Sequence, residues 1–124
     1  MTRRKAISTM AMAAGGVLVG CGKETRMVKH VILWKLKENL TDPKAVKAGI
    51  RQGLEELKGV VPGLMEIVVR SEGLASSNAD VMLDSTLASE AALKAYAVHP
   101  AHVKVAEERI RPFVQTRLCL DYLI

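Results

Sequence analysis

The sequence is short of aromatic side chains, with one Trp, two Tyr and one Phe among 124 residues. Proteins that bind single-stranded nucleic acid stack bases on several aromatic rings, and this chain has too few for such a surface. The net charge of +5 does not restore that function, because Arg3, Arg4 and Lys5 lie in a segment that we expect to be removed. The remainder has 15 basic and 13 acidic residues, so we expect no nucleic-acid partner.

Several sequence signatures of known activities are also missing. The chain has no Gly-rich phosphate loop, internal repeat, low-complexity tract or Ser/His/Asp arrangement. No cofactor motif occurs, so we expect no cofactor. A chain of 124 residues, 49% of them hydrophobic, has the length and composition of one globular domain plus a short extra segment.

The first 20 residues have the layout of an export signal, and we expect them to be cleaved. A cationic start is followed by an uncharged, mildly apolar stretch over residues 10–20, and small residues precede Cys21. Leu18-Val19-Gly20-Cys21 resembles the bacterial lipobox, in which the cysteine becomes the lipidated first residue. Residues 2–7 also resemble a twin-arginine motif, with Ala6 where that motif favours Phe, so both Sec and twin-arginine export stay open.

This interpretation predicts a lipoprotein, anchored by its lipid to a membrane of the cell envelope. Residues 21–26 would form a short linker and residues 27–124 the folded domain. The apolar stretch is too short to cross a bilayer, which needs about 20 residues. Two alternatives stay open, an ordinary N-terminal helix and a translation start at Met27, which would leave the protein in the cytoplasm.

The chain has two cysteines, Cys21 and Cys119. If Cys21 carries the lipid, Cys119 is the one thiol of the mature chain and has no intramolecular partner. This count excludes a structural disulfide and a zinc site built on cysteines alone. We expect Cys119 to be buried or half-buried in the last strand.

The first half of the domain predicts a strand, a helix and a second strand. Residues 28–37 are rich in β-branched side chains and predict a strand that is apolar on both faces. Asp42-Pro43 is typical of a helix start, and Gly59 supplies a stop signal. Residues 64–71 predict the next strand, after the break at Pro62-Gly63.

The second half predicts a strand, two helices and a final strand. Residues 79–88 pair with the preceding strand as a hairpin, and Ser89 caps the helix that follows it. His99-Pro100 interrupts this helix, since the residue before a proline is pushed out of helical geometry. The expected elements after the hairpin are a helix over 90–98, a helix over 100–111 and a strand over 114–123.

Two β-helix-β crossovers that share a hairpin predict one antiparallel sheet in the order 4-1-3-2, with every helix on the same side. This is the ferredoxin-like α+β arrangement. Val31 and Leu33 would leave a sizeable apolar patch on the bare face of the sheet. We therefore predict a homodimer in which two sheets cover each other, a dimeric α/β barrel.

The histidines are the side chains whose ordinary pKa lies close to neutrality. His30 shares a strand face with Ile32 and Trp34, and His102 borders the apolar stripe of the last helix, beside Val103. Both imidazoles should point into the gap between the sheet and the helices. Two histidines that converge in an apolar gap are a candidate for general acid/base catalysis.

Tyr96 carries a hydroxyl that can enter the same gap as a hydrogen-bond donor. The predicted catalytic residues are therefore His30, Tyr96 and His102, and the predicted substrate-binding residues are Ile32, Trp34, His99 and Val103. Three structural alternatives stay open: His30 as a satisfied core histidine, Tyr96 as a core aromatic, and His99 as a cap or a solvent-facing residue. No Asp or Glu lies on the apolar faces considered, so we predict no metal site.

Three segments together resemble the stress-responsive A/B barrel family, or Dabb family: residues 27–33 (MVKHVIL), 96–103 (YAVHPAHV) and 118–122 (LCLDY). The resemblance extends over about residues 27–123. It implies a dimeric α+β barrel made of two ferredoxin-like protomers. The family includes plant polyketide cyclases, in which histidines and a tyrosine promote aldol-type ring closure, and His30, Tyr96 and His102 match those motif positions.

The sequence therefore predicts a membrane-tethered protein that binds a small apolar or carbonyl compound in a pocket lined by His and Tyr. Whether the pocket performs acid/base chemistry of a cyclase or lyase type stays open. One alternative is a stress-response module that binds its ligand without chemistry. Another is a haem-linked, monooxygenase-like protein, since related dimeric α+β barrels include such families.

Overall fold

The computed structural model describes residues 26–124. The predicted signal peptide over residues 1–20 and the predicted lipidation of Cys21 lie outside the described residues. Within the described part of the chain, no helix combines the length and the apolar character needed to cross a bilayer.

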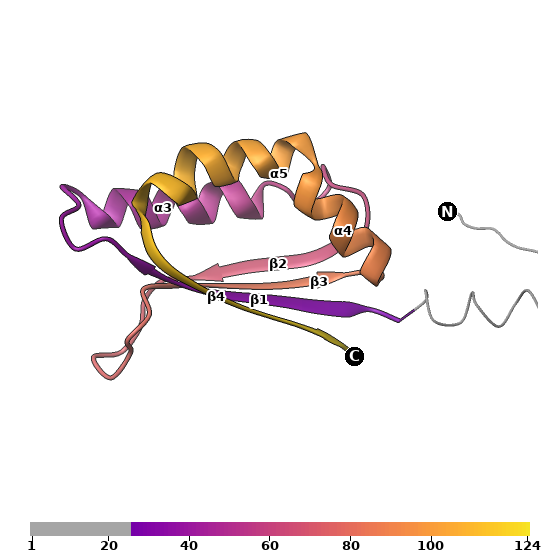
Figure 1. The fold of residues 1–124 in the computed structure, drawn as a ribbon, viewed down its shortest axis with the longest axis horizontal. Coiled ribbons are helices and arrows are strands. Elements are labelled where there is room, and N and C mark those ends of the chain that lie inside the picture. Colours follow the sequence, from indigo (N-terminus) through magenta and orange to yellow (C-terminus); the bar gives the residue numbers. More distant parts are fainter. Residues whose placement is uncertain (1–25) are drawn as a thin grey trace, which may run out of the picture.

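Four strands form one antiparallel sheet in the order β2-β3-β1-β4. The helices lie together on one side of this sheet (Figure 1). The predicted strand order and the ferredoxin-like α+β fold are confirmed. The strands are β1 (Val28–Leu36), β2 (Leu64–Arg70), β3 (Val81–Leu87) and β4 (Val114–Leu123).

The first helix, α3 (Pro43–Glu55), begins as the sequence predicts. The Asp42 side chain accepts a hydrogen bond from the backbone N–H of Ala45 at 3.1 Å, and Pro43 occupies the first helical position. In the turn that follows, Gly63 has a φ of 84°. A Cβ at this glycine would lie 2.7 Å from the Cβ of Ala92, so Gly63 lets the turn approach α4 (Glu90–Val98) closely.

His99 separates α4 from α5 (Pro100–Val105) and caps the second helix. Its backbone is extended, with a ψ of 132°, and its Nδ1 accepts a hydrogen bond from the N–H of Ala101 at 3.1 Å. The chain then continues as a π-helical turn, Ala106–Ile110, and a 3-10 turn, Arg111–Phe113. The sequence predicted an uninterrupted helix over 100–111. It did not predict the π-helical turn, because an added residue in a helical turn leaves no local sequence signal.

The hydrophobic core lies between the sheet and the helices. Alternate residues of β1, including His30, Ile32 and Trp34, face the helices and are buried. On α5, Val105 packs against the core, whereas Val103 is half-buried and lies outside the core cluster. Val105 faces inward because α3 and α5 approach each other closely at Gly53, where an added Cβ would lie 2.9 Å from Val105 Cγ1.

Strand β4 is the edge strand next to β1, and it is exposed along almost its whole length. Leu118 and Leu120 lie on the bare face of the sheet, paired with Leu33 and Val31, and each is 65% exposed. Cys119 is also exposed, although we predicted it to be buried or half-buried. That prediction was wrong because the helices do not cover this edge of the sheet.

Candidate functional site

The structure brings His30, Tyr96 and His102 to one cavity of about 460 Å³ between the sheet and the helices. β1 supplies His30 together with Ile32 and Trp34, α4 supplies Tyr96, and α5 supplies His102. Most of the remaining lining is apolar, and the cationic side chains are those of Arg111 and Arg117. The cavity therefore combines apolar walls with a few polar groups, as small-molecule sites do.

The Tyr96 ring lies close to both histidine rings. Its ring centroid is 5.9 Å from that of His30, with the two rings nearly perpendicular at 68°. The centroid of the His102 ring is 4.4 Å from that of Tyr96, and the two ring planes meet at 39°. The three rings thus form a contiguous polar-aromatic wall within an otherwise apolar cavity.

His30 is paired with a carboxylate that the sequence analysis missed. Its Nδ1 lies 2.5 Å from Oδ1 of Asp121, the residue directly opposite on β4. A carboxylate accepts hydrogen bonds, so this contact places a proton on Nδ1 and leaves Nε2 of a neutral imidazole with a free lone pair. The sequence analysis considered the apolar faces of β1 and the helices, which carry no Asp or Glu, and did not consider the register of β4, which brings Asp121 opposite His30.

His102 is oriented by the backbone of α4. Its Nδ1 lies 3.2 Å from the carbonyl oxygen of Ala97, so Nδ1–H donates and Nε2 is again the free nitrogen. Burial lowers the pKa of His102, and the nearby His30 lowers it further, while the hydrogen bond to Ala97 opposes these effects. The net result favours the neutral imidazole, which is the form that can accept a proton.

The Tyr96 side chain is 1% exposed, and its hydroxyl has no hydrogen-bond partner among the described residues. Burial raises the pKa of Tyr96 well above its ordinary value, so the phenol stays protonated. A buried donor without a partner is uncommon in folded proteins. The hydrogen-bonding capacity of this O–H is therefore unused within the described part of the chain.

Two of the predicted substrate-binding residues do not line this cavity. His99 uses its Nδ1 to cap α5, which agrees with the structural alternative considered for it. Val103 lies outside both the cavity lining and the core cluster. Of the predicted substrate-binding residues, Ile32 and Trp34 line the cavity.

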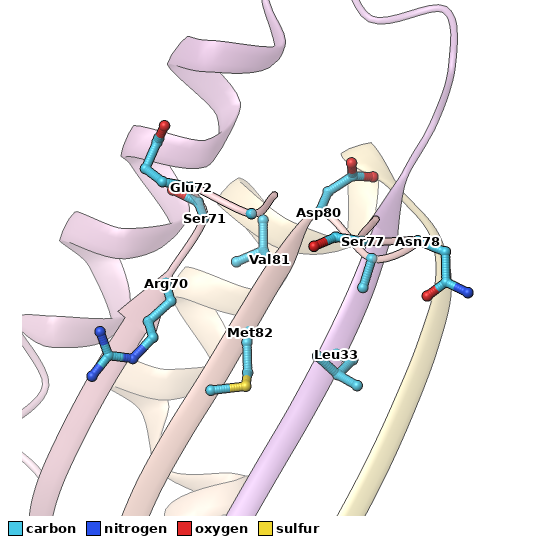
Figure 2. A pocket seen from close by; sticks show the side chains of 11 residues that line it. Leu33, Arg70, Ser71, Glu72, Ser77, Asn78, Asp80, Val81 and Met82 are labelled. Atoms are coloured by element: carbon cyan, nitrogen blue, oxygen red, sulfur yellow. The ribbon is translucent and has the colours of Figure 1, made fainter. Parts of the chain in front are cut away.

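A second cavity, of about 390 Å³, lies at the end of the sheet where β2 leads into the loop before β3 (Figure 2). Figure 2 shows Arg70 and Met82 on neighbouring strands, with Glu72 and Asp80 at the loop. Asp80 is already engaged, since its Oδ2 accepts a hydrogen bond from the N–H of Leu36 at 2.8 Å. The lining of this cavity includes no His, Cys or Tyr, so the first cavity is the better candidate for chemistry.

The sequence matches the model of the stress responsive A/B barrel domain family, Dabb, over residues 28–124. The chain belongs to the Dabb family. A comparison with curated proteins finds no match.

Among solved structures, this Dabb protein is similar to a dimeric protein of unknown function from Bacteroides fragilis, described as having a ferredoxin-like fold. The two share 25% identity and a TM-score of 0.74, over 79% of this chain and 96% of that one. A Dabb family protein from Mesorhizobium loti matches with 20% identity and a TM-score of 0.63, over 80% and 97% of the two chains. The hydroxynitrile lyase of Passiflora edulis matches with 18% identity and a TM-score of 0.68, over 81% and 94%.

Proposed function

We propose that this Dabb protein binds a small apolar carbonyl compound in the cavity of His30, Tyr96 and His102 and catalyses proton transfer on it. The observation that supports this function best is the set of three groups on one cavity: two imidazoles and a buried phenol. Among residues 26–124, neither Nε2 nor the phenol O–H has a hydrogen-bond partner. These are the groups that enolate chemistry requires, namely a base, an acid and a donor to the oxygen.

In the proposed reaction, Nε2 of His30 removes the proton from the carbon next to the carbonyl group. The electron pair of that C–H bond moves to the carbonyl oxygen, which accepts a hydrogen bond from the Tyr96 hydroxyl. The Asp121 carboxylate stabilises the imidazolium that forms on His30, through the Nδ1 contact. His102 then exchanges a proton with the enolate or its product. Acid/base groups placed in this way contribute about 10²–10⁴ to a rate.

The comparison with solved structures supports the scaffold of this proposal more than its reaction. The Passiflora edulis neighbour is a hydroxynitrile lyase, but at 18% identity the likeness concerns the fold. The resemblance to plant polyketide cyclases supports the same three residues, His30, Tyr96 and His102. The alternative function is a module that binds the ligand without converting it, and an experiment must distinguish this module from an enzyme.

We also propose that the protein is a homodimer held at a membrane of the cell envelope by a lipid on Cys21. The bare sheet face carries exposed apolar side chains, Leu118 and Leu120 among them, and a second copy would remove them from water. The Bacteroides fragilis neighbour and one from Thermobifida fusca are described as dimeric.

Hydrogen–deuterium exchange at carbon tests the proton transfer without knowledge of the natural substrate. The full chain would be incubated in D₂O with a panel of small apolar ketones, and NMR would follow loss of the proton signal next to the carbonyl. Native mass spectrometry would first identify the panel members that bind. For the ketones that bind, we expect the unchanged protein to exchange the proton faster than buffer does. In His30→Gln and in His102→Gln, the exchange rate should fall by about 10²–10⁴-fold.

The matched control is His99→Gln, because His99 caps α5 and does not line the cavity. This variant should keep exchange close to that of the unchanged protein once its helix content is verified by circular dichroism. Bound ketones that exchange no faster than in buffer would contradict catalysis and favour the binding module. Equal rates in the unchanged protein and in both cavity variants would contradict the roles of His30 and His102.

A further inference from the structure

A second group of reactive side chains lies at the outer side of His30. Nδ1 of His30, Sγ of Cys119 and a carboxylate oxygen of Asp121 all lie within 4.8 Å of one another. Nδ1 is 3.8 Å from Sγ and 2.5 Å from Oδ1, and Sγ is 3.4 Å from Oδ1. One nitrogen, one sulfur and one oxygen donor therefore converge on a single point of the β1–β4 seam.

The sheet register explains why these atoms meet. Asp121 lies directly opposite His30 across the β1–β4 ladder. Cys119 lies two residues before Asp121 on the same strand, so both side chains project to the same face. The backbone pairing, rather than a flexible loop, fixes the relative positions of the three ligands.

The spacing fits a tetrahedral ion of the size of zinc. Zn–S bonds of about 2.3 Å and Zn–N or Zn–O bonds of about 2.0–2.1 Å put the sulfur about 3.6 Å from each of the other two ligands. The observed sulfur distances, 3.8 Å and 3.4 Å, are close to this value. The nitrogen and oxygen should be about 3.3 Å apart around zinc, and here they are 2.5 Å apart because a proton lies between them.

Replacement of that proton by a metal ion requires only a small movement. The Asp121 carboxylate must withdraw by roughly 1 Å, as follows from the tetrahedral geometry. Its side chain is 40% exposed on the edge strand, so the carboxylate can move towards solvent. His30, which is buried, can stay where it is and would be the fixed ligand.

We propose that His30, Cys119 and Asp121 form a binding site for Zn²⁺. Three protein ligands leave the fourth position open, as in catalytic zinc sites, where it holds water or an exchangeable ligand. The ligands border a cavity of about 690 Å³ that gives this position access from outside. Glu90 on the cavity wall favours a cation, whereas Lys94 and Arg117 on the same wall oppose it, which limits the affinity.

The ion would also control the proton-transfer chemistry, a consequence that rests on the proposed function. A neutral imidazole that binds zinc through Nδ1 carries its proton on Nε2, and His30 then has no lone pair on the cavity side. Zinc would thus switch off the base that faces Tyr96. The earlier reason for expecting no metal site, the absence of a nearby acid, does not hold once Asp121 is located.

Cobalt titration tests the site independently of any turnover. Co²⁺ replaces Zn²⁺ in N/S/O sites, and a bound thiolate gives a ligand-to-metal charge-transfer absorption in the near ultraviolet. The full chain, freed of metal, would be titrated with Co²⁺, and Zn²⁺ would then displace the colour. We expect the band in the unchanged protein and a loss of Zn²⁺ affinity of at least about 100-fold in Cys119→Ser and in Asp121→Asn.

Cys21→Ser is the matched control, because it removes the other thiol of the chain and leaves the proposed ligands intact. The cobalt band should persist in this variant and vanish in Cys119→Ser, while circular dichroism shows both variants folded. Absence of the band in the unchanged protein would overturn the proposal. So would a band that survives Cys119→Ser and disappears with Cys21→Ser. Since the readout is metal binding, either result leaves the proton-transfer experiment to be judged separately.

Discussion

Strands β3 and β4 flank β1 on its two sides, yet their surroundings differ sharply. Every second residue of β3 is buried under the helices, whereas β4 has no buried residue. β4 is nevertheless rich in apolar side chains, including Leu118, Leu120 and Leu123. Burial of a strand thus depends on what covers it, and composition alone does not reveal it. The candidate site lies at the boundary, where covered β1 meets uncovered β4 through His30 and Asp121.

The largest expected effect is on stability, and it compares one leucine from each flanking strand. Leu83→Ala on β3 removes a fully buried side chain and leaves a cavity, which should cost about 3 kcal/mol in the free energy of unfolding. Leu118→Ala on β4 removes an exposed side chain and should cost less than about 1 kcal/mol in the isolated protomer. Urea unfolding at low protein concentration measures both values, and equal losses would contradict the contrast between the two strands.

The next effect concerns the partner that we propose for the bare face. Leu118→Lys combined with Leu120→Lys puts two charges per copy into the expected interface, and should weaken the dimer by at least about 100-fold, or roughly 2.7 kcal/mol. Analytical ultracentrifugation over a concentration series measures the dissociation constant. Leu74→Lys is the control, since Leu74 is exposed in the loop between β2 and β3. A double variant that dimerises like the unchanged protein would show that the copies meet through another surface.

Local sequence patterns were sufficient for most of the fold. Asp42 and Ser89 are caps that act within three residues, and His99-Pro100 breaks the helix where the chain requires it. The alternation along β1 identified the buried face that carries His30. Each of these features is determined by neighbours in the chain, so a single sequence contains the information.

Side-chain contacts that depend on the exact register between distant strands were not available from the sequence. Asp121 is 91 residues from His30, and only the β1–β4 register brings the two together. The exposure of Cys119 depends on where the helices end above the sheet, which no local pattern encodes. The π-helical turn at Ala106–Ile110 is likewise set by packing rather than by a sequence signal. The LCLDY segment, which carries the resemblance to the Dabb family, contains Asp121. The resemblance did not indicate that Asp121 pairs with His30.

A smaller effect on stability distinguishes the two tyrosines, Tyr96 in the region covered by the helices and Tyr122 on the uncovered strand β4. Tyr96→Phe removes a buried hydroxyl that has no partner among residues 26–124, so it should raise the free energy of unfolding by about 1 kcal/mol while it weakens ligand binding. Tyr122→Phe on β4 changes an exposed hydroxyl and should stay within about 0.5 kcal/mol of the unchanged protein. Chemical denaturation measures both. A destabilised Tyr96→Phe would mean that the hydroxyl already has a partner in the folded protein.

The smallest effect is a pH dependence of stability that belongs to the covered region. Burial lowers the pKa of His102 below the ordinary value of about 6.5 that it has in the unfolded chain, so protonation favours unfolding. Its contribution to stability is therefore complete above about pH 6.5, and it is lost as the pH falls towards and through the folded pKa. The measurement is the difference in unfolding free energy between the unchanged protein and His102→Gln from pH 8 to pH 5. Gln can still donate to the Ala97 carbonyl but does not titrate, so a difference that stays constant across this range would show that His102 is not desolvated.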